Sequence, residues 1–115
     1  AKVGKEHPRV RLYGTIDEVN SQVGVVRMEL NRMPSISLEV RNTADEAMGR
    51  VQQELFDVGG ECSCTPGKLP DQMVLIGSDA CDRLVDEMDM WLEDLEPLES
   101  FIMPTGSPPV ATLHV

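Results

Sequence analysis

A polar stripe within the segment from Arg11 to Gly24 is the first place where residue types and spacing could do chemistry. Asp17, Asn20, Ser21 and Gly24 recur at i, i+3, i+4 and i+7, which places them on one face of a helix. A helix face that only needs to be solvated usually carries lysine and glutamate, whereas this face is small and polar. The pattern therefore predicts a close neighbour, either another part of the protein or a ligand.

Three residues are candidates for a site, and each also has a simple structural interpretation. Asp17 fits the first turn of a helix, where the helix dipole favours an aspartate. Phe101 fits a core anchor at a junction between a loop and a helix, although its ring could also fill space and exclude water without coordinating a metal. Lys5 fits a solvated lysine, although a compact ammonium group also suits a polyphosphate.

The sequence offers little for a metal site. Cys62 and Cys64 lie in a predicted loop and lack a second pair of ligands, so we expect no metal there. His7 and His114 have no glutamate three residues upstream, as a ferritin-type di-metal site would need. The odd count of three cysteines favours a reducing compartment, and we expect a cytoplasmic protein.

The charge of the chain excludes some partners. The net charge of −10 argues against nucleic acid and against anionic membrane surfaces, since both need clustered lysine and arginine. The acidic run between Asp79 and Glu96 is interpreted as a solvated outer face. An anionic ligand stays possible, because a few local donors outweigh a distant acidic face across a Debye length. No apolar run is long enough for a transmembrane helix.

Capping and turn signals divide the chain into helices. Thr15 and Glu18 have the spacing of a capping box, so we expect the first helix to begin at Thr15, after an irregular arm over residues 1–10. Gly59 and Gly60 are expected to end the second helix. The predicted helices cover residues 15–31, 38–58 and 79–95, the last capped by Ser78, and a fourth begins near Pro108 behind Ser107.

Long helices without strands predict an all-α, up-and-down helical bundle, with residues 1–115 in a single domain. The predicted fourth helix has barely two turns before Val115. Because a helix this short would not stand alone, we expect the domain to be incomplete.

Three stretches of the sequence together resemble the ATP:cob(I)alamin adenosyltransferases of the PduO type. Residues 5–24 agree with the family pattern K-x-x-P-R-V-x-x-Y-G-T-x-D-E-x-N-S-x-x-G. Residues 51–61 are similar to the family's second helix and its exit, and residues 100–108 are similar to its S-F-I-L-P-G-G-S loop. His114 and Val115 fit the start of the helix that follows. Three motifs in the family's order are a specific signal, and the resemblance covers most of the chain.

The resemblance implies an enzyme that transfers the 5′-deoxyadenosyl group from ATP to the cobalt of cob(I)alamin, with release of triphosphate and with Mg²⁺ as cofactor. Phe101 would lie at the lower face of the corrin and exclude the axial ligand, which makes the reduction to Co(I) easier. Asp17 would pair with an arginine across a subunit interface, and Lys5 would contact the ATP phosphates. The family forms homotrimers with active sites between subunits, and its complete domain is a ferritin-like bundle of four to five helices.

Two parts of the family pattern are missing from the chain. The glycine-rich nucleotide loop T-x-x-G-D-x-G-x-T should precede Lys5, and an R-R-A-E-R helix should follow His114. Since both supply phosphate and magnesium contacts, we expect a domain that is incomplete at both ends and a poor enzyme if these residues stand alone. Thr105 and Arg11 depart from the family, which usually has glycine and a small or acidic residue there. The alternative is a non-catalytic helical bundle that acts as a cobalamin carrier or an interaction module.

Overall fold

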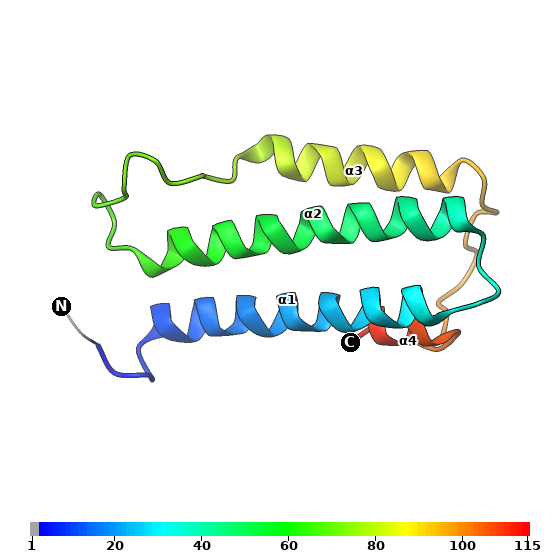
Figure 1. Cartoon of the computed structure of the whole chain (residues 1–115), viewed down its shortest axis with the longest axis horizontal. Helices are drawn as coiled ribbons and strands as arrows, with labels where there is room; N and C mark the ends of the chain where they lie inside the picture. Colours follow the sequence, from blue (N-terminus) through cyan, green and yellow to red (C-terminus); the bar gives the residue numbers. More distant parts are fainter. Residues whose placement is uncertain (1–2) are drawn as a thin grey trace.

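The structure, a computed structural model, describes residues 3–115 as helices joined by loops, with no strand among these residues (Figure 1). The first three helices run alternately in opposite directions, and the short last helix lies beside the end of the first. The predicted all-α, up-and-down fold is confirmed. The elements are α1 (Pro8–Arg32), α2 (Leu38–Ser63), α3 (Ser78–Leu92) and α4 (Pro108–Leu113).

The start of α1 differs from the expectation. The helix begins at Pro8, so Thr15 does not cap it and residues 8–10 are not an irregular arm. Proline at the first helical position already has the required φ, and the His7 side chain caps the helix by accepting the Arg9 amide proton over 3.1 Å. The Thr15 hydroxyl instead donates to the Arg11 carbonyl over 2.9 Å, as hydroxyls inside helices do.

The end of α2 also differs, because Gly59 and Gly60 do not stop the helix. α2 continues to Ser63, and the loop then contains Gly67 with a φ of +80°. A Cβ atom at Gly59 would lie 3.8 Å from the Ile16 side chain, an ordinary van der Waals distance, so this position faces α1. Gly59 therefore lies within α2 beside α1 and does not mark a helix end.

The boundaries of α3 and α4 were predicted more closely. α3 is preceded by Gly77 as its N-cap residue, so the prediction of Ser78 as the cap was wrong by one position. It ends at Leu92, three residues early, since the acidic residues that follow are unfavourable at the negative end of a helix dipole. α4 begins at Pro108 behind Ser107, as predicted.

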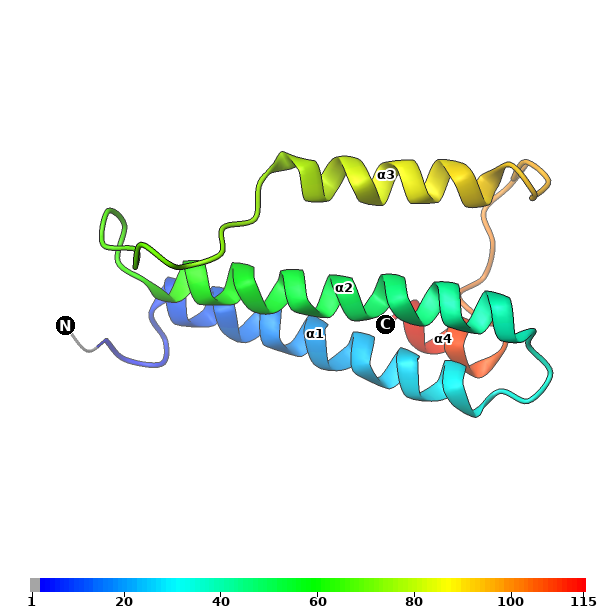
Figure 2. The ribbon, with the colours of Figure 1, turned by 45° about the horizontal axis from the view of Figure 1, so that its top comes forward.

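The buried core is small and lies toward one end of the α1–α2 pair. Val26 and Leu30 of α1 and Ala47 of α2 are 2%, 4% and 8% exposed, and Pro109 of α4 is buried as well. α1 packs on both α2 and α4, whereas α3 stands apart from the other ribbons (Figure 2). Consequently no residue of α3 is buried.

Candidate functional site

A pocket of about 390 Å³ opens between the first half of α1 and the last turns of α2. Both helices line it, and the absence of side chains at their glycines leaves the space open. The pocket is partly apolar and partly polar, which is typical of ligand sites and of interfaces. Residues that line it include Tyr13, Asp17 and Asn20 of α1 and Leu55, Phe56 and Gly59 of α2.

Asp17 lines this pocket and is exposed. It lies nine residues after Pro8, and the first turn of α1 contains no acidic residue. The helix dipole acts only over the first turn, so the structural interpretation of Asp17 as a first-turn aspartate is wrong. Among residues 3–115, no cation forms a salt bridge with its carboxylate.

Asn20 and Gln52 connect α1 to α2 beside the pocket. The Asn20 side-chain amide donates to the Gln52 carbonyl over 3.2 Å, and the Gln52 side-chain amide donates to the Asn20 carbonyl over 3.2 Å. The Oδ1 atom of Asn20 is buried and has no hydrogen-bond partner among the described residues. The close neighbour predicted for the polar stripe of α1 is therefore α2, at least at Asn20.

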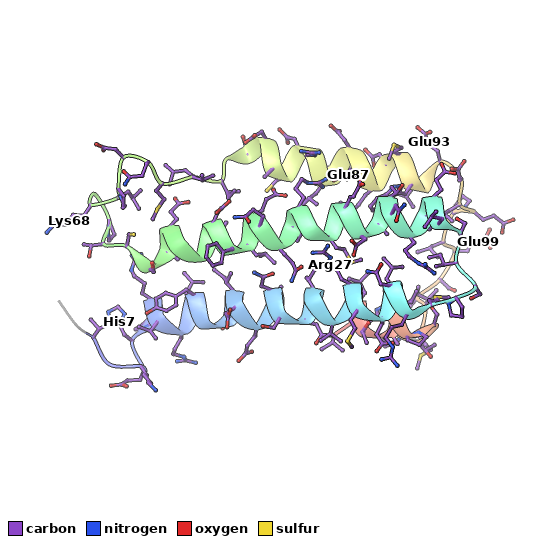
Figure 3. All side chains as sticks on the ribbon, in the orientation of Figure 1. His7, Arg27, Lys68, Glu87, Glu93 and Glu99 are labelled. Carbon is purple, nitrogen blue, oxygen red and sulfur yellow. The ribbon has the colours of Figure 1, made fainter. Side chains whose placement is uncertain are left out.

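A charged pair continues this connection toward the core. Arg27 of α1 donates from Nε and Nη2 to the two carboxylate oxygens of Asp45 of α2, over 2.9 and 3.0 Å, and from Nη1 to Gln52 over 2.8 Å. Figure 3 shows Arg27 between the two helices. The hydrogen bonds from Arg27, with a further one from Asn31, lower the pKa of Asp45, and the same contact with Asp45 raises the pKa of Arg27.

Phe101 lies in the segment between α3 and α4 and is fully exposed, with a relative exposure of 105%. Its interpretation as a core anchor is therefore wrong. The neighbouring residue Glu99 lies at the end of the molecule opposite His7, and the pocket with Asp17 lies toward the His7 end (Figure 3). The structure thus does not bring Phe101 and Asp17 together within one chain.

Lys5 is exposed in the turn that precedes α1, at the same end of the molecule as the pocket. It does not line the pocket. Its position fits a solvated lysine, and equally a lysine free to reach a bound anion.

An apolar groove of about 390 Å³ runs between the helices at the core end. All four helices line it, and on α3 it meets an ion pair between Glu87 and Arg50 of α2. Figure 3 shows Glu87 on the side of α3 that faces α2. The groove is the open interior of the bundle, and its apolar walls include Leu30, Ala47, Met48, Leu84 and Val110.

Residues 3–115 contain no group of three or more histidine, cysteine and acidic side chains that could hold a metal ion. All three cysteines are free thiols. Arg9 of α1 donates to the carbonyl oxygens of Cys62 and Cys64 over 3.1 and 3.4 Å. These two hydrogen bonds connect the start of α1 to the end of α2. None of the helices in the described part is both long and apolar enough to cross a bilayer.

Sequence reasoning missed the residues that join α1 to α2. Nothing local in the sequence marks Arg27, Asp45 and Gln52 as partners, because the residues they bond across the two helices lie 14 to 32 positions away along the chain. The only sequence signal was the small, polar stripe of α1, which indicated a neighbour without identifying it.

A family model described as "Cobalamin adenosyltransferase" matches residues 1–115. A protein of Cupriavidus metallidurans named "Cobalamin adenosyltransferase" is 33% identical over 115 residues, which are 100% of this chain and 55% of that protein. The "Corrinoid adenosyltransferase" of Bacillus subtilis is 29% identical over 114 residues, 99% of this chain and 55% of its own length.

A third relative is the "Corrinoid adenosyltransferase PduO" of Salmonella typhimurium, 30% identical over 117 aligned residues, 98% of this chain and 31% of that protein. The chain thus spans about half the length of the first two relatives, and less of the third. No solved structure matches the chain significantly.

Proposed function

Because the chain belongs to the cobalamin adenosyltransferase family, we propose that the protein transfers the 5′-deoxyadenosyl group of ATP to cob(I)alamin. The electron pair of Co(I) attacks C5′ of ATP. A cobalt–carbon bond forms, the bond from C5′ to the triphosphate oxygen breaks, and the cobalt becomes formally Co(III). Triphosphate leaves with the electron pair of the broken bond. The relatives named above support transfer over the carrier alternative, because each of them is named as an adenosyltransferase.

The exposed ring of Phe101 carries the proposal at the level of residues. Covering the exposed ring of Phe101 with another surface would be favourable by roughly 1.5–3 kcal/mol. We assign that surface to the lower face of the corrin. There the ring would exclude water and the axial base without coordinating cobalt, which favours Co(I) and leaves the upper face free to attack C5′.

Asp17 would complete the site from another copy of the chain. Its carboxylate faces a pocket and has no salt-bridge partner among the described residues. An arginine from a neighbouring copy would supply that partner, as the family resemblance implies. The separation of Phe101 from Asp17 within one chain also favours a site between copies, and we propose a homotrimer.

We assign ATP binding in part to Lys5, whose exposed ammonium could reach a phosphate. The described residues do not fit Mg²⁺, because no cluster of carboxylates gathers among them. No step is therefore assigned to Mg²⁺ on this chain. The acidic composition of the chain supports the absence of nucleic acid and of anionic membranes as partners.

The open apolar groove supports a domain that other segments complete. Its walls come from all four helices, yet nothing among residues 3–115 fills it. We propose that residues 1–115 are part of one helical-bundle domain, extended at both ends in the whole protein. A cytoplasmic location is proposed from the odd number of cysteines.

The proposal is tested by incubating the full-length protein with ATP and chemically reduced cobalamin, and by measuring adenosylcobalamin and triphosphate together. We expect the two products in equal amounts, and none without the reductant. Binding of cobalamin without consumption of ATP would overturn the proposal in favour of the carrier.

A further inference from the structure

Apolar packing holds α1 against α2 only partly at the pocket, where Ile16 and Leu55 are half-buried. The buried apolar residues of these helices, Val26, Leu30 and Ala47, all lie toward the other end of the pair. No residue of 3–25 and no residue of 48–63 is fully buried. Because close packing of fully buried side chains is what normally fixes the axial register of two packed helices, the half-buried contacts beside the pocket leave part of that task to another interaction.

The reciprocal hydrogen bonds of Asn20 and Gln52 supply that interaction. Each side chain donates to the backbone carbonyl of the other residue, and both distances are 3.2 Å. A slide of α1 by one residue moves Asn20, which is the donor of one bond and the acceptor of the other, by about 1.5 Å along the axis, and so disturbs the geometry of both contacts at once. Two hydrogen bonds that are disturbed together favour one register.

The rest of the network fixes how Gln52 is oriented. Its Oε1 atom accepts from Nη1 of Arg27 over 2.8 Å, so its amide nitrogen must face Asn20. Arg27 is in turn held by two hydrogen bonds to Asp45. The amide of Gln52 therefore cannot flip without losing contacts on both sides.

Two glycines provide the space for this network. A Cβ atom at Gly24 would lie 3.2 Å from the amide nitrogen of Gln52, and a Cβ atom at Gly49 would lie 3.1 Å from the guanidinium of Arg27. A side chain at either position would press on the network. The close approach of the helices and the hydrogen bonds thus depend on each other.

We propose that Asn20 and Gln52 are positioning residues, which set the register of the α1 wall of the pocket against its α2 wall. Asn20 lies three residues from Asp17 and itself lines the pocket, while Gln52 precedes the facing residues Leu55 and Phe56. A change in register would therefore move Asp17 relative to the opposite wall. The consequence for adenosyl transfer rests on the proposed function, whereas the consequence for the geometry of the pocket does not.

The test compares Asn20→Ala with Asn31→Ala in the full-length protein. Asn31 is the control, because it is an asparagine of the same helix at the far end of the network, three turns from Asn20, and its loss leaves the two hydrogen bonds from Arg27 to Asp45 and the Asn20–Gln52 pair in place. Gln52→Glu is the second variant. It keeps an acceptor for Arg27, replaces the donor to the Asn20 carbonyl with a carboxylate oxygen and adds a negative charge, with little change in side-chain volume.

Two measurements separate positioning from general stability. Hydrogen exchange followed by mass spectrometry should become faster over residues 13–20 and 55–60 in Asn20→Ala and Gln52→Glu, and not in Asn31→Ala. In the transfer assay, kcat should fall about 10- to 100-fold for the first two variants, because a misplacement of about 1 Å at a site can cost that much. The KM for ATP should stay within about threefold, and Asn31→Ala should retain the parent kcat.

Equal exchange in all three variants, or a uniform rise over the whole chain, would overturn the proposal. So would faster local exchange with an unchanged kcat in an active protein. If the parent protein forms no adenosylcobalamin, the proposed function fails, and the exchange measurement alone then decides whether Asn20 and Gln52 set the register of the pocket.

Discussion

Replacing Phe101 by alanine should separate activity from stability. Phe101 is fully exposed and makes no contribution to the core of its own chain. Substitutions at such positions usually change the free energy of unfolding by less than about 0.5 kcal/mol. The variant should therefore unfold at the same urea concentration as the parent protein.

Its activity should fall sharply, and the structure sets the scale. The whole ring is available to cover a ligand, and burial of a phenylalanine side chain contributes roughly 1.5–3 kcal/mol. If that free energy is used when the corrin binds and reacts, its loss lowers kcat/KM for cob(I)alamin by about 10- to 150-fold. The KM for ATP should change little, because the ring is assigned to the corrin.

The assay is steady-state transfer with reduced cobalamin, followed by the absorbance change as adenosylcobalamin forms. Met103→Ala is the control, because Met103 lies in the same segment and is also exposed. We expect the control to retain the parent kcat/KM. Electron paramagnetic resonance of bound cob(II)alamin should show an axial ligand in Phe101→Ala and none in the parent. A variant with parent kinetics and a parent spectrum would refute the assignment of Phe101.

The remaining predictions concern the interface and the α1–α2 pair. Asp17→Asn should weaken association between copies by about 2 kcal/mol or more, as sedimentation would detect; an unchanged oligomer would contradict the interface assignment. Asp45→Asn should lower the free energy of unfolding by about 1 kcal/mol at pH 7, measured by urea titration. The folded pKa of Asp45 lies below the ordinary value of about 3.9, so the difference in the free energy of unfolding between parent and variant should persist above pH ~3.9. The difference should vanish as the pH falls through the folded pKa. A constant difference down to about pH 2 would refute this reasoning. Leu30→Ala should lower the free energy of unfolding by about 2 kcal/mol, the low end for a buried leucine, because Leu30 borders an open groove. A loss above about 4 kcal/mol would indicate that the groove is filled in the whole protein.

Helix positions were predictable where a single residue restricts the backbone. Pro108 set the start of α4, since proline prefers the first helical position, whereas the same signal at Pro8 was passed over in favour of Thr15. The predicted helix start at Thr15 and helix end at Gly59 were wrong, because a capping spacing and a glycine pair permit a helix end without requiring one. α1 begins earlier, at Pro8 behind the His7 cap, and α2 continues past Gly59 beside Ile16 of α1.

The candidate site could be predicted in part. The motif that contains Asp17 was visible as a stripe of small and polar residues, and the structure places Asp17 at a pocket. Its connection through Asn20 and Gln52 was not visible, because those two residues are 32 positions apart. The exposure of Phe101 did not follow from its local pattern, since an aromatic residue in an apolar run is as compatible with burial as with exposure; only the family resemblance, which assigns the ring to a ligand, favoured it.

By itself, the sequence determined the helical class, the approximate number of helices and the family, since periodicity, prolines and short motifs are local properties of the chain. Only the tertiary structure decided which faces meet. The pairing of Arg27 with Asp45, the register set by Asn20 and Gln52, and the exposure of Phe101 depend on how distant segments approach. Such contacts contribute free energy only after the helices have come together, and so no local pattern of residues encodes them.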